Sequence, residues 1–172
     1  MSLKQYDFAY GRGRKTFSLD DSDVIATVRT EEFPVMADVK AGVLDAVRHP
    51  IGCDSLDNIV KPGQTVAFIC NDPTRVANSY DFMPVLIDEM NRLGIKDEDM
   101  KIVFSLGSHR DMTHEEMVAA VGEEVASRLK MYNSTCTVQD DFEYFGKTSR
   151  GTPVWINKHL CDVDHVLSLI HI

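Results

Sequence analysis

The chain has 172 residues, of which 44% are hydrophobic and 26% are charged, and these proportions are those of an ordinary globular protein. Such a length suffices for one domain that buries roughly two-thirds of the surface exposed by its unfolded chain. The net charge of −9 argues against nucleic acid as a partner, because a phosphate-binding surface needs clustered lysine and arginine.

The sequence gives no sign of export or of a membrane anchor. No apolar run approaches the ~20 residues that span a bilayer, and the first residues lack the apolar core of a secretory signal. The cysteines have no C-x-x-C spacing, which favours reduced thiols over disulfides or a zinc site. They are Cys53, Cys70, Cys136 and Cys161. We therefore expect a cytoplasmic protein without a membrane partner, in which Cys70 is a small buried hydrophobe.

The first sixty residues are predicted to combine short strands with two helices. Strands are expected at 6–10, 15–19 and 24–28, separated by Gly-Arg-Gly and Asp-Asp-Ser-Asp turns. Apolar residues recur at helical spacing between Asp38 and Arg48, which predicts an amphipathic helix. A shorter helix is expected from Ser55 to Val60.

The segment from Thr65 to Leu93 has the pattern of a strand followed by a helix. Thr65–Cys70 is continuously apolar, as expected of a strand covered on both faces in a parallel sheet. The helix is predicted to begin at Ser79 or Asp81 and to end at Leu93, with Gly94 as its C-terminal stop.

A second strand and helix follow directly. Lys101–Leu106 is the strand, and Thr113 begins the helix with Glu116 completing a capping box. A strand–helix–strand connection implies a right-handed crossover and a parallel pair. The two strands then end at the same edge of the sheet, which is where ligands bind in open α/β proteins.

The last part of the chain is predicted to hold a hairpin, 142–145 with 153–157, and one more buried strand, 164–170. The whole pattern indicates the α/β class: a Rossmann-like parallel sheet with flanking helices and additional short strands or a hairpin toward both ends. We assign residues 1–172 to a single domain of this kind.

The loop Asp72-Pro73-Thr74-Arg75 follows the first buried strand and places a carboxylate near a guanidinium. Pro73 fixes the backbone, and Thr74 can hydrogen-bond locally. Arginine is well shaped to grip a carboxylate with two hydrogen bonds, so Arg75 is a candidate anion ligand. The alternative is an Asp72–Arg75 pair that only braces its own loop.

The loop Gly107-Ser108-His109-Arg110 follows the second strand, at the same predicted edge. Imidazole exchanges protons near neutral pH, which makes His109 a candidate general base. The backbone N–H groups of Gly107 and Ser108 could form a nest for an anion. Arg110 could contact an anion or cap the following helix.

Several familiar motifs are missing from the sequence. His114-Glu115-Glu116 is not H-E-x-x-H, because residue 118 is Val, and no phosphate-binding P-loop occurs. Gly11-Arg12-Gly13 lacks the third glycine of a dinucleotide fingerprint. No cluster of metal ligands is visible, so a metal hydrolase built on Asp72 and His109 is disfavoured and no metal-ligating residue is assigned.

Three stretches give the chain a resemblance to the N-terminal domain of the nickel-dependent lactate racemase (LarA-like) family. They are His49-Pro50-Ile51-Gly52-Cys53-Asp54-Ser55-Leu56, Asn71-Asp72-Pro73-Thr74-Arg75 and Leu106-Gly107-Ser108-His109-Arg110-Asp111-Met112-Thr113-His114-Glu115-Glu116. D-x-T-R followed about thirty residues later by G-x-H-R-x-x-T-x-E-E is fairly specific, and the resemblance covers roughly residues 5–168.

The resemblance implies an isomerase that interconverts the stereoisomers of lactate or a related 2-hydroxy acid. A histidine takes the hydroxyl proton while a nickel pincer nucleotide accepts the C2 hydrogen as hydride, giving a transient 2-oxo acid. On this carry-over His109 is an acid/base histidine, Arg75 steadies the substrate, and Asp72 is the acidic residue beside it. Cofactor contacts are assigned to the loop residues Thr74, Gly107, Ser108 and Arg110.

The resemblance fades after Ser168. The family continues there with a second histidine, a Gly-rich stretch, a cofactor-anchoring lysine and a nickel-ligating histidine, for which His171 is no substitute. We expect a C-terminally truncated product whose last residues are foreign and which is inactive without its C-terminal domain. The alternative is a non-catalytic Rossmann-like module that binds a small anion or nucleotide at the strand-end crevice.

Overall fold

The computed structural model describes residues 3–170, so the prediction about His171 lies outside the described residues. The chain forms two compact units, Met1–Val35 and Met36–Ile172. The assignment of residues 1–172 to one domain stays a prediction. Among the described residues, no helix is both long and apolar enough to cross a membrane.

The first unit is an antiparallel hairpin of β1 (Leu3–Tyr10) and β2 (Gly13–Asp20). Phe8 and Phe17 stack across the two strands with ring centroids 4.9 Å apart. The short helix η1 (Asp21–Asp23) follows. The strand predicted at 24–28 is wrong: these residues pair with no described strand, and the side chains of Ile25 and Val28 are fully exposed.

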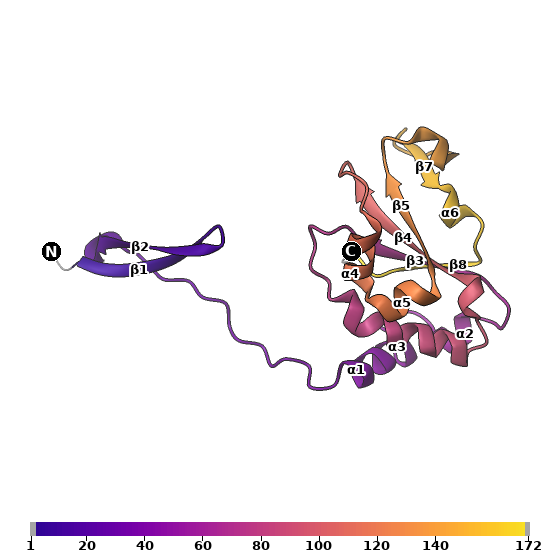
Figure 1. Cartoon of the computed structure of the whole chain (residues 1–172), viewed down its shortest axis with the longest axis horizontal. Helices are drawn as coiled ribbons and strands as arrows, with labels where there is room; N and C mark the ends of the chain where they lie inside the picture. The colour runs from indigo at the N-terminus through magenta and orange to yellow at the C-terminus, as the bar shows by residue number, and fades with distance from the viewer. Residues whose placement is uncertain (1–2, 171–172) are drawn as a thin grey trace. The chain divides into compact units, whose positions relative to one another are not determined.

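The second unit is built on a four-stranded parallel sheet in the order β5-β4-β3-β8 (Figure 1). Its members are β3 (Val66–Asn71), β4 (Met100–Gly107), β5 (Lys130–Thr135) and β8 (His165–Ser168). The predicted parallel pair is confirmed as β3 and β4, at the centre of the sheet. The last strand was expected to be buried, but β8 is an edge strand and alternate residues of it are exposed.

Helices gather on one face of this sheet (Figure 1). They are α1 (Val39–Arg48), α2 (Leu56–Ile59), α3 (Ser79–Arg92), the short η2 (Asp97–Asp99), α4 (His114–Val121) and α5 (Glu123–Arg128). Alternate residues of β3 and β4, such as Phe68 and Phe104, pack against apolar residues of α3, α4 and α5 in the core. The helices predicted at 38–48, at 55–60 and from Ser79 are therefore confirmed, as is the capping box of Thr113.

A second hairpin lies beyond the C-terminal end of β5 (Figure 1). It consists of β6 (Phe142–Lys147) and β7 (Pro153–Asn157), preceded by η3 (Gln139–Asp141) and followed by α6 (Lys158–Cys161). Asn157 is buried, and its Nδ2 donates to Ser134 Oγ of β5 at 3.1 Å. His159 of α6 stacks on Tyr132 of β5 with centroids 3.7 Å apart. These contacts fix the hairpin to the sheet.

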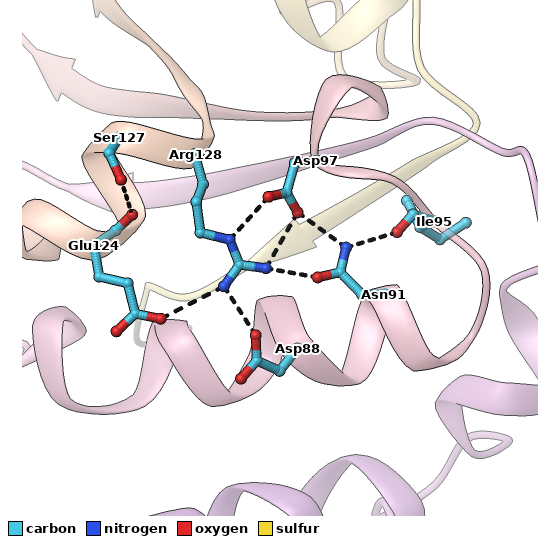
Figure 2. Close-up of polar contacts among 7 residues, drawn as sticks. All are labelled: Asp88, Asn91, Ile95, Asp97, Glu124, Ser127 and Arg128. Carbon is cyan, nitrogen blue, oxygen red and sulfur yellow. Dashed lines mark hydrogen bonds and ion pairs between the residues drawn. The ribbon is translucent and has the colours of Figure 1, made fainter.

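Arg128 joins three segments of the chain, as Figure 2 shows. Its Nε donates to Asp97 Oδ2 at 2.9 Å, and its Nη1 lies 2.8 Å from Asp88 Oδ1. Nη2 also donates to Asn91 Oδ1 at 2.6 Å, so the guanidinium ties α5 to α3 and to η2. The surrounding carboxylates raise the pKa of Arg128, with the Asp97 hydrogen bond as the largest cause.

We expect Arg128→Ala to lower the free energy of unfolding by about 1–2 kcal/mol, because several acceptors lose a donor that is only 20% exposed. Urea denaturation at neutral pH measures this loss. Arg150→Ala is the matched control, since Arg150 is exposed in the turn between β6 and β7. Equal effects of the two changes would contradict a structural role for the Arg128 contacts.

Candidate active site

The loop after β3 is organised around the Asp72 carboxylate, which is buried with only 8% of its side chain exposed. Asp72 Oδ1 accepts hydrogen bonds from the Thr74 backbone N–H at 3.1 Å and from the Thr74 hydroxyl at 2.7 Å. The Arg75 N–H donates to the Asp72 carbonyl at 3.2 Å, which closes a tight turn. Thr74 is thereby committed to shaping this loop.

The loop after β4 brings His109 to the same carboxylate. Gly107 has a φ of 58°, a left-handed conformation that costs glycine little, and the His109 N–H donates to the Leu106 carbonyl at 3.0 Å. This sharp turn directs the ring toward the neighbouring strand end. His109 Nδ1 contacts Asp72 Oδ2, while 52% of the histidine side chain stays exposed.

The environment of Asp72 keeps it ionised. Burial works to raise its pKa, but the hydrogen bonds from Thr74 and His109 together outweigh burial and lower it. An ionised Asp72 accepts a hydrogen bond from Nδ1–H, which leaves the lone pair of His109 on Nε2. The pair thus presents a half-exposed proton acceptor held by a buried carboxylate.

Arg75 lies on the exposed side of the same loop, and its guanidinium has no hydrogen bond or ion pair with the described residues. The interpretation of an Asp72–Arg75 pair bracing the loop is therefore wrong, since Asp72 pairs with Thr74 and His109 instead. Arg75 lines a pocket of about 250 Å³ between the β3 loop and α4. Asp72 also lines this pocket, whereas His109 stands outside it.

Arg110 is engaged within its own loop. Its Nη1 and Nη2 donate to the two carboxylate oxygens of Glu116 at 2.8 and 2.6 Å, and Nη1 also donates to the Asp111 carbonyl at 2.8 Å. Glu116 closes the capping box with Thr113, and its hydrogen bond to Arg110 is the main reason that its pKa falls to about 2. Of the two roles considered for Arg110, anion contact and capping of the following helix, the geometry matches the second.

The sequence predicted that Asp72, Arg75 and His109 lie at one edge of the sheet. It did not predict the hydrogen bond between Asp72 and His109. The signal was present in the pattern, because β3 and β4 are adjacent and parallel, so loops of similar length meet at their ends. Among the described residues, no group of three or more His, Cys, Asp or Glu side chains could hold a metal ion. The cofactor contacts assigned to Thr74, Gly107, Ser108 and Arg110 stay predictions.

Comparison with known proteins places this geometry in context. A family model described as "Lactate racemase N-terminal domain" matches residues 10–172. The chain is 26% identical over 164 residues to a lactate racemase of Thermoanaerobacterium thermosaccharolyticum and 27% identical over 120 residues to one of Lactiplantibacillus plantarum. The matches cover 94% and 70% of this chain, but the chain spans only 38% and 28% of the length of these relatives.

Solved structures show the same fold. The lactate racemase apoprotein of Thermoanaerobacterium thermosaccharolyticum superposes with a TM-score of 0.80 at 24% identity, covering 96% of this chain and 38% of that one. A protein of Thermotoga maritima gives a TM-score of 0.57 at 18% identity, covering 76% of this chain and 32% of that one. The predicted α/β class with a parallel sheet, flanking helices and short hairpins is thus confirmed.

Proposed function

Because the chain belongs to the lactate racemase N-terminal domain family, we propose that it supplies the proton-transferring part of an isomerase active site for lactate or a related 2-hydroxy acid. The contact between His109 and the buried Asp72 carries this proposal. A carboxylate that fixes one nitrogen of an exposed imidazole leaves the other free to act on a substrate proton.

In the proposed reaction, His109 Nε2 accepts the proton of the substrate hydroxyl. The imidazolium that results is stabilised by Asp72, whose lowered pKa keeps it negative at neutral pH. Inversion also requires that the C2 hydrogen leave as hydride and return to either face, and the proton from His109 then restores the hydroxyl of the stereoisomer that forms. Because the pair is fixed at two rigid strand ends, the imidazole need not reorganise between the two directions.

Arg75 is proposed to hold the substrate carboxylate. It is a guanidinium with no partner among the described residues, and it stands on the same loop as the carboxylate that orients the base. A planar guanidinium can hold a carboxylate through two parallel hydrogen bonds. The negative charge of the substrate would thereby be balanced at a point beside, and not on, the proton acceptor.

The nickel pincer nucleotide implied by the resemblance would accept and return the C2 hydride of the substrate. The described residues do not offer a donor set for nickel, since no three potential ligands gather. Arg110 is also saturated by Glu116. The proposal for this chain is therefore limited to substrate binding and the proton, and the hydride is assigned to none of its residues.

The test is an isomerisation assay on two proteins, the 172-residue chain alone and the product of the complete reading frame made together with its cofactor. Chiral chromatography follows conversion of one lactate enantiomer to the other. We expect conversion by the complete product and none by the chain alone. Conversion by the chain alone would refute the proposal that hydride transfer needs groups outside these 172 residues. A complete product that binds hydroxy acids without converting them would favour a non-catalytic anion-binding module.

Replacing Arg75 separates substrate binding from proton transfer. We expect Arg75→Lys to lower kcat/KM roughly tenfold, mainly through KM, because an ammonium cannot make the two parallel hydrogen bonds of a guanidinium. Steady-state kinetics of the complete product measure the split. Arg12→Lys, at the exposed turn between β1 and β2, is the control and should change neither constant. An unchanged KM in Arg75→Lys would contradict the proposal that Arg75 binds the substrate carboxylate.

A further inference from the structure

We infer that a pocket at the end of β5 receives the side chain of the substrate and that the preferred 2-hydroxy acid carries an apolar ring or branched chain larger than the methyl group of lactate. This inference rests on the proposed function and adds a specificity site to it. The pocket is lined by Cys136, Thr137, Gln139, Phe142, Pro153 and Trp155 and has a volume of about 490 Å³.

The pocket adjoins the loop that carries His109. Cys136 is the first residue after β5, and its backbone N–H donates to the Gly107 carbonyl at 3.0 Å. Gly107 lies two residues before His109. The pocket residue Cys136 is therefore hydrogen-bonded to the first residue of the turn that holds His109. The buried Asn157 holds the β6–β7 hairpin, which forms the other wall, against Ser134 of β5.

The pocket offers an aromatic surface that the described residues do not cover. Phe142, Pro153 and Trp155 provide apolar walls, and 45% of Trp155 is exposed. Tyr144 packs behind Trp155 with ring centroids 4.9 Å apart, which fixes the indole in place. The polar side chains of Thr137 and Gln139 lie beside this apolar wall, so the pocket can take an apolar substituent that is attached to a polar group.

The strand order assigns each part of a hydroxy acid to its own strand end. β3 carries Arg75 in its loop, β4 carries His109, and β5 leads into the pocket, in this order across the sheet. Neighbouring strands lie about 4.8 Å apart, so β3 and β5 end roughly 10 Å from each other. A 2-hydroxy acid that extends from Arg75 past His109 toward the pocket beyond β5 therefore needs a substituent on C2 longer than a methyl group.

The inference is tested on the 172-residue chain with 3-phenyllactate and lactate as probes. Trp155 is the only tryptophan of the chain, so its fluorescence reports on the pocket without mutation. We expect saturable quenching by 3-phenyllactate and none by lactate at the same concentration, with an affinity at least about tenfold higher for the aromatic acid. Alkylation of Cys136 should slow when 3-phenyllactate is bound, while that of Cys53, also exposed, serves as the internal control.

Two variants and one further readout separate the possible results. Phe142→Ala should weaken 3-phenyllactate binding, and Phe145→Ala should not, because Phe145 is exposed on the same strand but does not line the pocket. Perturbation of the His109 NMR signals by both acids, without any change at Trp155 or Cys136, would overturn the inference and leave the proposed function standing. A response at Trp155 with none at His109 would overturn the inference and count against the proposed function as well.

Discussion

Asp72→Asn is expected to lower kcat of the complete product by about four orders of magnitude while the fold is retained, as expected when a buried carboxylate that orients a catalytic histidine becomes an amide. The cause lies in the fixed orientation of the new side chain. Thr74 donates twice to Oδ1 of residue 72, so the amide oxygen must take that position. The amide NH₂ then faces His109 and donates to Nδ1, which moves the ring proton to Nε2 and removes the proton acceptor.

The matched control is Asp45→Asn. Asp45 of α1 has its Oδ1 2.9 Å from Nδ1 of His49, the residue after that helix, so the same change is made in a carboxylate–histidine pair whose two side chains are both largely exposed. This control should leave kcat unchanged. ¹⁵N NMR of the ring nitrogens reports the tautomer of His109 directly. A variant that keeps Nδ1 protonated, or that keeps kcat within tenfold of the parent, would contradict the assignment of His109 as the base.

Glu89→Gln should have the largest effect on stability among the ion-pair variants, about 2–3 kcal/mol of the free energy of unfolding at neutral pH. Glu89 of α3 is only 4% exposed, and its two oxygens accept from Arg48 of α1 and from Arg92, each through two nitrogens at 2.9 Å. An amide can accept through its oxygen alone and turns its NH₂ toward a guanidinium. The exposed halves of the two arginines limit the loss, because water solvates them once they are released.

The same carboxylate predicts how stability depends on pH. The hydrogen bonds from Arg48 and Arg92 lower the pKa of Glu89 from 4.5 to about 2 in the folded chain. A lowered folded-state pKa contributes stability above the unfolded value, and this contribution is lost as the pH falls from about 4.5 toward 2. The stability difference between the parent and Glu89→Gln should therefore shrink over this interval.

Urea denaturation of both proteins across this pH range is the measurement. Glu98→Gln is the control, because Glu98 pairs with Lys96 at 3.2 Å with both side chains about three-quarters exposed, and such pairs add little. A stability difference that stays constant down to pH 2 would show that Glu89 acts through packing and not through its charge.

The central part of the fold could be predicted because its sequence signals are local. The continuous apolar run of β3, Gly94 after α3 and the capping box of Thr113 each specify an element boundary without help from the rest of the chain. These boundaries in turn place Asp72 and His109 at one edge of the sheet. Candidate site residues were thus accessible from the sequence.

Elements that depend on distant partners were not accessible in this way. The apolar residues at 24–28 resemble a strand but find no partner strand among the described residues. β5 was not assigned to the sheet, since Tyr132, Asn133 and Ser134 interrupt the apolar pattern. Tyr132 contacts α6, Ser134 contacts β7, and Asn133 hydrogen-bonds the Met112 backbone. β8 was expected to be buried, yet its position at the sheet edge exposes alternate residues. In all three segments, the presence and position of a partner strand determine the structure, and the composition of the segment does not.

The pairing of β8 with β3 has a consequence for the order in which the chain folds. The side chain of Asp164 accepts from the Thr65 N–H and hydroxyl at 2.8 and 2.9 Å, and these contacts join residues 99 positions apart. β4 and β5 lie nearer to β3 in the chain and pair without waiting for residue 165. During synthesis at about 5–20 residues per second, one edge of β3 therefore has to stay unpaired for several seconds until β8 emerges. That interval is when a nascent chain is most exposed to aggregation through an open strand edge.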